Sequence, residues 1–88
     1  MDVDVLITNI TKNILEKVDS TSQITIFDES YKHHKHSGYI AGKYHLKIKI
    51  ISKELSSTTR IIAHKKIFQA LDSLMTHIHA ISIIIVQE

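Results

Sequence analysis

The chain has 88 residues, a formal net charge of +2 and no cysteine. This length predicts one domain, 1–88, and the hydrophobic fraction of 43% is too high for a disordered chain. The missing thiols exclude disulfides, a cysteine nucleophile and a metal site made of the chain's own cysteines.

The first predicted element is a helix over residues 2–18, where apolar residues recur every three or four positions along one face. Its acidic start, "MDVDVLIT", lacks the basic region of a signal peptide, and no apolar run reaches the roughly 18 residues of a membrane helix. We therefore expect a cytoplasmic protein without a membrane segment. A strand at residues 23–29, "QITIFDE", is rich in β-branched residues, and a long loop that contains histidines follows it.

The second predicted strand, at residues 43–51, has the clearest pattern in the chain. Apolar side chains at the even positions alternate with lysine and histidine at the odd positions. One face of this strand is therefore predicted to be buried and the other exposed to water. His45 belongs to the exposed face, and the pattern predicts no role for it.

The last two predicted elements are a helix from Arg60 to about His77 and a strand at residues 80–86, "AISIIIV". The order αββαβ predicts an α+β fold in which helices pack on one face of a three-stranded mixed sheet. The packed face of the second helix is expected to contain Ile67, Phe68, Leu71, Leu74 and Met75.

Three histidines, His33, His34 and His36, lie together in the loop between the first two strands. Such a cluster can be an ordinary polar surface loop, a set of phosphate contacts or a set of metal ligands. In the last case the loop alone would bind a divalent metal such as zinc. His79 lies at the start of the last strand. In a mixed three-stranded sheet this position can lie near the end of the first strand, where the histidine loop begins.

Six cations form a second group of candidate residues. A face exposed to water explains them, and a phosphate-contacting surface is the alternative, aided by the helix N-terminus near Thr58 and Thr59. Three of the cations belong to the second strand and three to the second helix: Lys43, Lys47, Lys49, Arg60, Lys65 and Lys66.

Motifs of common enzyme classes are missing from the sequence. There is no phosphate-binding loop, no dinucleotide-binding glycine pattern and no nucleophile elbow. We therefore expect a protein that is not an enzyme.

Four motifs, taken in order along the chain, resemble those of the BolA family. "DESYKH" precedes the loop, and "KYHLKIKIIS" is similar to the family's His-aromatic strand that ends in serine. "AHKKIFQAL" looks like the family's Arg-His-Arg stretch, with Ala63 and Lys65 in place of the arginines, and "IHAISI" looks like its His-Ala-Leu ending. The resemblance covers essentially the whole chain and implies a BolA-like fold similar to class II KH domains.

The resemblance also implies a function and a set of ligands. The function is that of a non-enzymatic adaptor, which forms a heterodimer with a monothiol glutaredoxin and shares a [2Fe-2S] cluster in iron–sulfur cluster assembly, trafficking or iron regulation. The implied ligands are His79 and either His33 or His36, whereas His34 matches no ligand position. Glutaredoxin and glutathione would supply the thiolates of the other iron, so we expect no cluster on the isolated chain.

A DNA-binding transcriptional regulator is the alternative function that the resemblance implies, because some family members are described in this way. It would use the six cations as phosphate contacts. The low net charge argues against DNA binding. The chain also lacks the GXXG loop with which KH domains clamp nucleic acid, because Gly38 and Gly42 are one residue too far apart.

Overall fold

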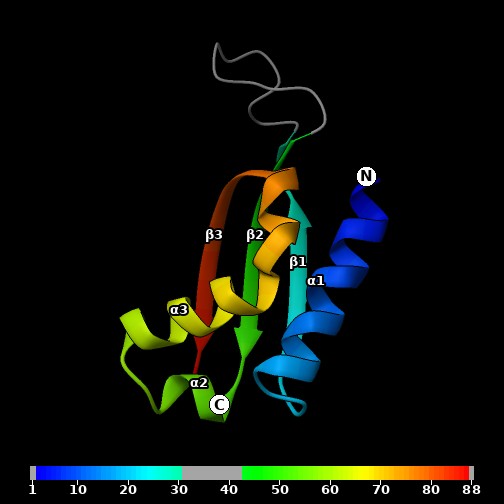
Figure 1. The fold of residues 1–88 in the computed structure, drawn as a ribbon. Coiled ribbons are helices and arrows are strands. Elements are labelled where there is room, and N and C mark those ends of the chain that lie inside the picture. Colours follow the sequence, from blue (N-terminus) through cyan, green and yellow to red (C-terminus); the bar gives the residue numbers. More distant parts are fainter. Residues whose placement is uncertain (1, 31–42, 88) are drawn as a thin grey trace.

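The computed structural model describes residues 2–30 and 43–87, and Figure 1 shows their arrangement. It confirms the α+β class that the sequence predicts. The elements in chain order are α1 (Val3–Lys17), β1 (Gln23–Asp28), β2 (Tyr44–Ile51), α2 (Lys53–Ser56), α3 (Arg60–Leu71), the 3-10 helix η2 (Asp72–His77) and β3 (Ile78–Val86).

The three strands form one mixed sheet in the order β1-β2-β3. β1 pairs with β2 in the antiparallel sense, and β2 pairs with β3 in the parallel sense. A parallel pair needs a long crossover connection, which α2, α3 and η2 provide here. α1, α3 and η2 all lie on the same face of the sheet (Figure 1), as the sequence predicts.

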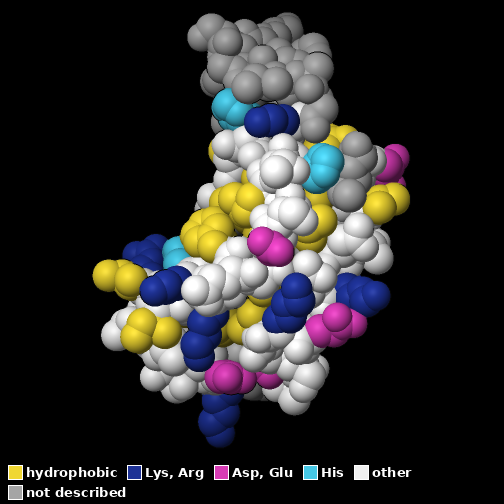
Figure 2. Space-filling model, in the orientation of Figure 1, with side chains coloured by type: hydrophobic (Ala, Val, Ile, Leu, Met, Phe, Trp, Pro, Cys, Tyr) yellow, Lys and Arg dark blue, Asp and Glu magenta, His cyan; other side chains and the backbone are white. Residues whose placement is uncertain are grey.

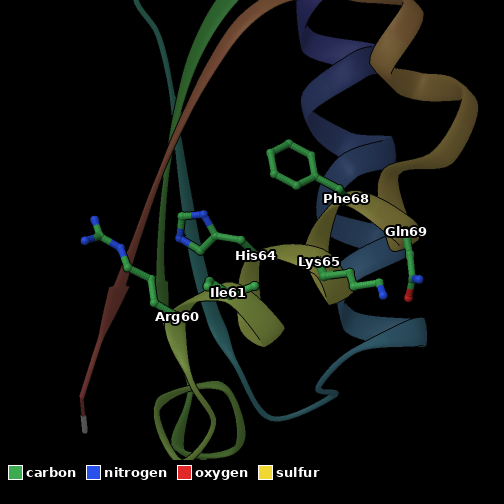
Figure 3. Close-up of a pocket in the computed structure, with 6 residues that line it drawn as sticks. All are labelled: Arg60, Ile61, His64, Lys65, Phe68 and Gln69. Carbon is green, nitrogen blue, oxygen red and sulfur yellow. The ribbon is translucent and has the colours of Figure 1, made fainter.

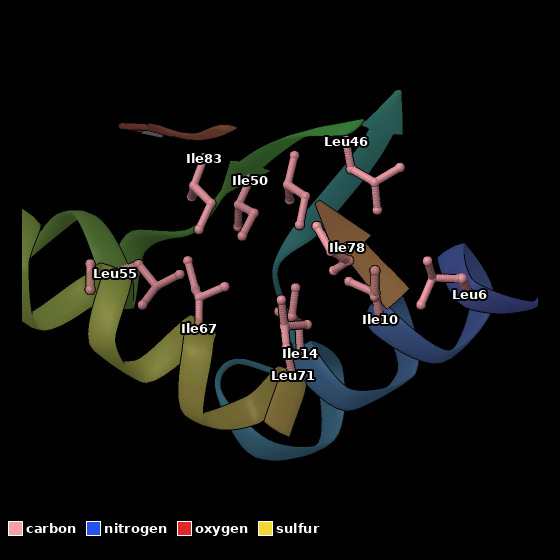
Figure 4. Packing of buried hydrophobic residues seen from close by; sticks show 12 residues of the cluster. Leu6, Ile10, Ile14, Leu46, Ile50, Leu55, Ile67, Leu71, Ile78 and Ile83 are labelled. Atoms are coloured by element: carbon pink, nitrogen blue, oxygen red, sulfur yellow. The ribbon is translucent and has the colours of Figure 1, made fainter. Parts of the chain in front are cut away.

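The hydrophobic core lies between the sheet and these helices (Figure 4). Alternation along β2 places Leu46, Ile48 and Ile50 on the covered face, where each is at most 2% exposed. Burying a side chain of this size contributes about 1.5–3 kcal/mol, so this pattern is a main determinant of which face the helices cover. The helices contribute fully buried residues at helical spacing: Leu6, Ile10 and Ile14 from α1, and Ile67 and Leu71 from α3.

The predicted second helix differs from the structure in its length and in its packed face. α3 ends at Leu71 because Asp72 has a φ of 48°, and the chain continues as the 3-10 helix η2 as far as His77. A positive φ is uncommon outside glycine, although Asp tolerates it better than most residues. Phe68 is 39% exposed, so its expected place on the packed face is wrong. The short helix α2 is an element that the sequence pattern does not predict.

A buried polar cluster holds two turns together at the end of β2. The hydroxyl of Ser52 donates to Asp19 Oδ2 at 2.5 Å and accepts from the backbone N–H of Leu55 at 3.1 Å, which makes Ser52 the N-cap of α2. Asp19 also accepts from the hydroxyl and the backbone N–H of Thr21 at 2.7 and 2.9 Å. The serine that ends the family-like strand motif is therefore a structural residue.

Candidate functional site

The candidate site lies at the end of the sheet where β2 and β3 begin and β1 ends. Because β2 and β3 are parallel, their first residues Tyr44 and Ile78 are paired. Because β1 is antiparallel to β2, its last residue Asp28 pairs with Leu46 at the same end. The structure thus confirms that the start of the last strand and the end of the first strand share one end of the sheet, with β2 between them.

Two histidines from different strands lie against each other at this end. The ring centroids of His45 and His79 are 4.8 Å apart, and their planes are inclined by 44°. The strand register shifts here, since Tyr44 pairs with Ile78 but His45 pairs with Ala80. His79 is therefore the extra residue of an irregularity in the ladder, and such irregularities turn a side chain out of the regular alternation. The imidazole of His79 is exposed, and that of His45 is half-buried.

Backbone hydrogen bonds fix the chain around His45. The N–H of His45 donates to the hydroxyl of Ser30 at 3.0 Å, and the carbonyl of His45 accepts from the N–H of Glu29 at 2.7 Å. The Ser30 hydroxyl in turn donates to Asp28 at 2.6 Å. These bonds place the chain that leaves β1 directly beside the two imidazoles.

A cavity of about 300 Å³ opens between these segments. Glu29 comes from the chain after β1, His45 from β2 and His79 from β3, so all three elements that meet at this end contribute to it. The cavity also has small and apolar walls, which are formed by Leu46, Ala80, Ile81 and Ser82.

The side chains at this site that could hold a metal ion are the two imidazoles and the carboxylate of Glu29. Within residues 2–30 and 43–87, no group of three or more His, Asp or Glu side chains is placed to hold a metal ion. His33 and His36, the implied partners of His79, lie outside the described residues, as does His34. The segment that contains them is flanked by Ser30 and Lys43, and Ser30 is bonded to His45 beside the site. A ligand set built on His79 is therefore a prediction that needs a further donor.

The six candidate cations do not share one surface. Lys47 and Lys49 belong to the face of the sheet opposite the helices described above, and Lys43 directly precedes β2. Arg60 and Lys65 line a hollow on α3, whereas Lys66 lines a different one.

The N-terminus of α3 already has an internal acceptor. The hydroxyl of Thr59 accepts from the N–H of Ile62 at 3.2 Å, as an N-cap does, and the hydroxyl of Thr58 donates to the carbonyl of Leu55 at 3.0 Å. One of the helix's first N–H groups is thus satisfied by the chain itself. The arrangement gives no single phosphate-contacting surface made of all six cations.

A helix–strand–strand–helix–strand domain with a histidine at the start of its last strand invites comparison with known families. The family model described as BolA-like protein matches residues 15–87 of the chain. The chain belongs to the BolA-like protein family. The resemblance seen in the four sequence motifs is thereby confirmed.

Solved BolA-like structures have the same fold as this BolA-like chain. It is similar to the BolA domain of SufE1 from Arabidopsis thaliana, with 23% sequence identity, a TM-score of 0.69, and coverage of 91% of this chain and 88% of that chain. BolA1 from Arabidopsis thaliana gives 21% identity, a TM-score of 0.69 and the same coverage. A bol-like protein from Babesia bovis gives 11% identity, a TM-score of 0.67, and coverage of 91% and 81%. A search of the curated proteins finds no significant match.

His45 is the residue of this site that sequence reasoning missed. Alternation along β2 assigns it to the exposed face, but only the register with β3 brings it to His79. The motif "KYHLKIKIIS" contains this histidine, so the family pattern was the one signal that pointed to it.

Across the described residues, no helix of this BolA-like chain has the length and apolar character needed to cross a bilayer.

Proposed function

We propose that this protein is a non-enzymatic BolA-like adaptor that binds a monothiol glutaredoxin and shares a [2Fe-2S] cluster with it, in iron–sulfur cluster assembly, trafficking or iron regulation. The observation that carries the proposal is the exposed imidazole of His79, packed against His45 at the end of the sheet. The histidine-containing segment is joined to the described chain beside this pair.

The donor chemistry of the chain fits half of a cluster site. Imidazoles replace two thiolates on one iron of Rieske-type [2Fe-2S] centres, so a histidine pair is an acceptable ligand set for one iron. The chain has no cysteine to serve the other iron. The remaining thiolates would come from the glutaredoxin and glutathione, and the cluster would then be cargo held between two proteins.

The fold restricts the position of His79. Its neighbours Ile78 and Ala80 are paired with β2 on either side of the irregularity, and the ring of His45 limits the orientations that the His79 imidazole can adopt. We propose His79 as one ligand and either His33 or His36 as the second. His45 then acts as a positioning residue, since it contacts the imidazole of His79 on the side of β2.

The test is to mix the protein with a monothiol glutaredoxin that carries its cluster, in the presence of glutathione. We expect a one-to-one heterodimer in size-exclusion chromatography and a changed visible absorption and circular dichroism spectrum. His79→Ala should leave the glutaredoxin spectrum unchanged, whereas His77→Ala, two residues away at the end of η2, should behave as the unmodified protein. If His79→Ala changes the spectrum in the same way as the unmodified protein does, His79 is not a ligand.

The same visible spectrum can show which loop histidine is the second ligand. His33→Ala and His36→Ala are expected to differ, with only one of them shifting the visible bands, and His34→Ala serves as their matched control. If His34→Ala alone changes the bands, the ligand assignment taken from the family pattern is wrong.

DNA-binding transcriptional regulation is the alternative that the same experiment series must address. It would rely on Lys43, Lys47, Lys49, Arg60, Lys65 and Lys66, which do not share one surface of the fold. If all six cations contact phosphate, raising the salt concentration from 50 to 200 mM should weaken binding to duplex DNA by about a thousandfold. Absence of binding at the lower salt concentration would remove this alternative.

A further inference from the structure

The outer surface of α3 exposes large apolar side chains. Ile61 is 81% exposed and Phe68 is 39% exposed, although the opposite side of the same helix is packed into the core. Residues 61, 64, 65 and 68 recur at helical spacing, so they form one continuous stripe. Single exposed apolar residues are common, but a stripe around a common hollow is characteristic of an interaction surface.

This stripe lines an open, shallow hollow of about 690 Å³ (Figure 3). His64 and Phe68 extend their rings from the same side of α3, and Ile61 lies next to His64. The lining is completed by two cations and an amide, namely Arg60, Lys65 and Gln69. We call these six residues the α3 face.

The α3 face contains two cations, Arg60 and Lys65, and no carboxylate. The helix Arg60–Leu71 contains Arg60, Lys65 and Lys66 and no acidic residue. Apolar and basic side chains interleave over α3 at the left of the space-filling view (Figure 2). The complementary occupant therefore carries carboxylates around apolar side chains.

The N-terminal part of the α3 face lies far from His79. Arg60 and His64 also line a cavity with Ile85 and Gln87, near the C-terminal end of β3, whereas His79 lies at the beginning of that strand. A rise of about 3.3 Å per residue separates His79 from Ile85 by roughly 20 Å. An occupant that contacts Arg60 and His64 is therefore separated from the imidazole of His79 by most of the length of β3.

We propose that the α3 face docks an acidic segment of a partner protein, whose apolar side chains pack against Ile61 and Phe68 and whose carboxylates contact Arg60 and Lys65. The hollow beside Ile61 and Phe68 is open and shallow, so a short segment of a partner can lie along it. Nucleic acid phosphates would use the cations but would leave the exposed isoleucine without an apolar partner. This docking goes beyond the shared cluster and does not rest on it.

The probe is a fluorescent, helical peptide in which glutamate and leucine alternate at helical spacing. Two matched peptides replace either the glutamates by lysine or the leucines by serine. In a titration followed by amide NMR, we expect the first peptide to shift the resonances of residues 60–69 and to leave those around His79 unchanged. Both control peptides should bind at least about tenfold more weakly, because each lacks one half of the complementarity.

Protein variants then localise the contact. Ile61→Ser should weaken binding of the first peptide by about fivefold to tenfold. Val5→Ser, which changes a 52% exposed residue on α1, should leave this affinity unchanged. His79→Ala should bind the peptide normally, which separates this proposal from the shared cluster. Equal binding of the lysine peptide, peptide-induced shifts outside α3, or no binding at all would overturn it. So would duplex DNA or phosphatidylserine vesicles that shift the same resonances equally with and without Ile61→Ser.

Discussion

The two ends of β2 carry polar groups in contrasting states. At its C-terminal end, Ser52 and Asp19 are only 1% and 8% exposed, and each is bonded to groups of the chain itself. At its N-terminal end, His45 meets an exposed His79 beside an open cavity. Polar groups that satisfy each other internally stabilise the fold, whereas the exposed imidazole of His79 remains accessible to a ligand. The same family-like strand motif therefore ends in a serine that is bonded inside the fold and has, near its start, a histidine beside an open cavity.

The largest effect on stability is expected from Asp19→Ala. This change removes the acceptor for Ser52 and Thr21 and leaves a buried hydroxyl without that partner, so the free energy of unfolding should fall by about 2–3 kcal/mol. Urea denaturation measures it. Ser57→Ala removes an exposed serine hydrogen bond to the carbonyl of Glu54 and is the matched control, with a change within about 0.5 kcal/mol. Equal effects of the two variants would show that the buried cluster contributes no special stability.

The same cluster should make stability depend on acidity. The hydrogen bond from Ser52, followed by those from Thr21, holds the pKa of Asp19 below its ordinary value of 3.8. A lowered folded-state pKa gives a stabilising contribution that is complete above the unfolded-state value and is lost as the pH falls through the folded-state value. Compared with Asp19→Asn by urea denaturation, the native protein should therefore keep a constant advantage from pH 7 to about 5 and lose it below about 4. An advantage that persists unchanged at pH 2 would contradict this account.

The smallest effect on stability is expected at the histidine end of β2. His45→Asn removes a half-buried ring contact, so the free energy of unfolding should change by less than about 1 kcal/mol. The heterodimer with glutaredoxin should still form, but its visible circular dichroism should change, because the imidazole of His79 loses the ring that limits its orientation. Identical circular dichroism for the native protein and His45→Asn would remove the positioning role, whatever the stability.

Much of the fold follows from patterns within single segments. Alternation over residues 43–51 correctly predicts the covered face of β2, and helical spacing predicts the buried side of α1. The end of α3 was not predictable in this way, because it depends on one backbone angle at Asp72 inside a sequence that otherwise favours a helix. The exposure of Phe68 was also missed, since helical spacing alone does not reveal how wide the packed face is.

The candidate site was only half predictable from sequence. His79 was found from its place at the start of the last strand and from the family pattern, and its position at the end of the sheet followed from the topology. The contact between His45 and His79 depends on the register of two strands that are distant in sequence, and on an irregularity in that register. Periodicity within one strand contains no information about either.

The 3-10 helix η2 has a consequence for changes in chain length. Its six residues, Asp72–His77, join α3 directly to β3, where Ile78 is buried and His79 is exposed. His79 is the extra residue of the irregularity in the ladder, and both His79 and Ala80 are exposed, so regular alternation begins only after this point. No loop residue separates η2 from β3, so a deletion or insertion in η2 changes the connection directly before the irregularity. Such a change in chain length would therefore act first on the position of the His79 imidazole.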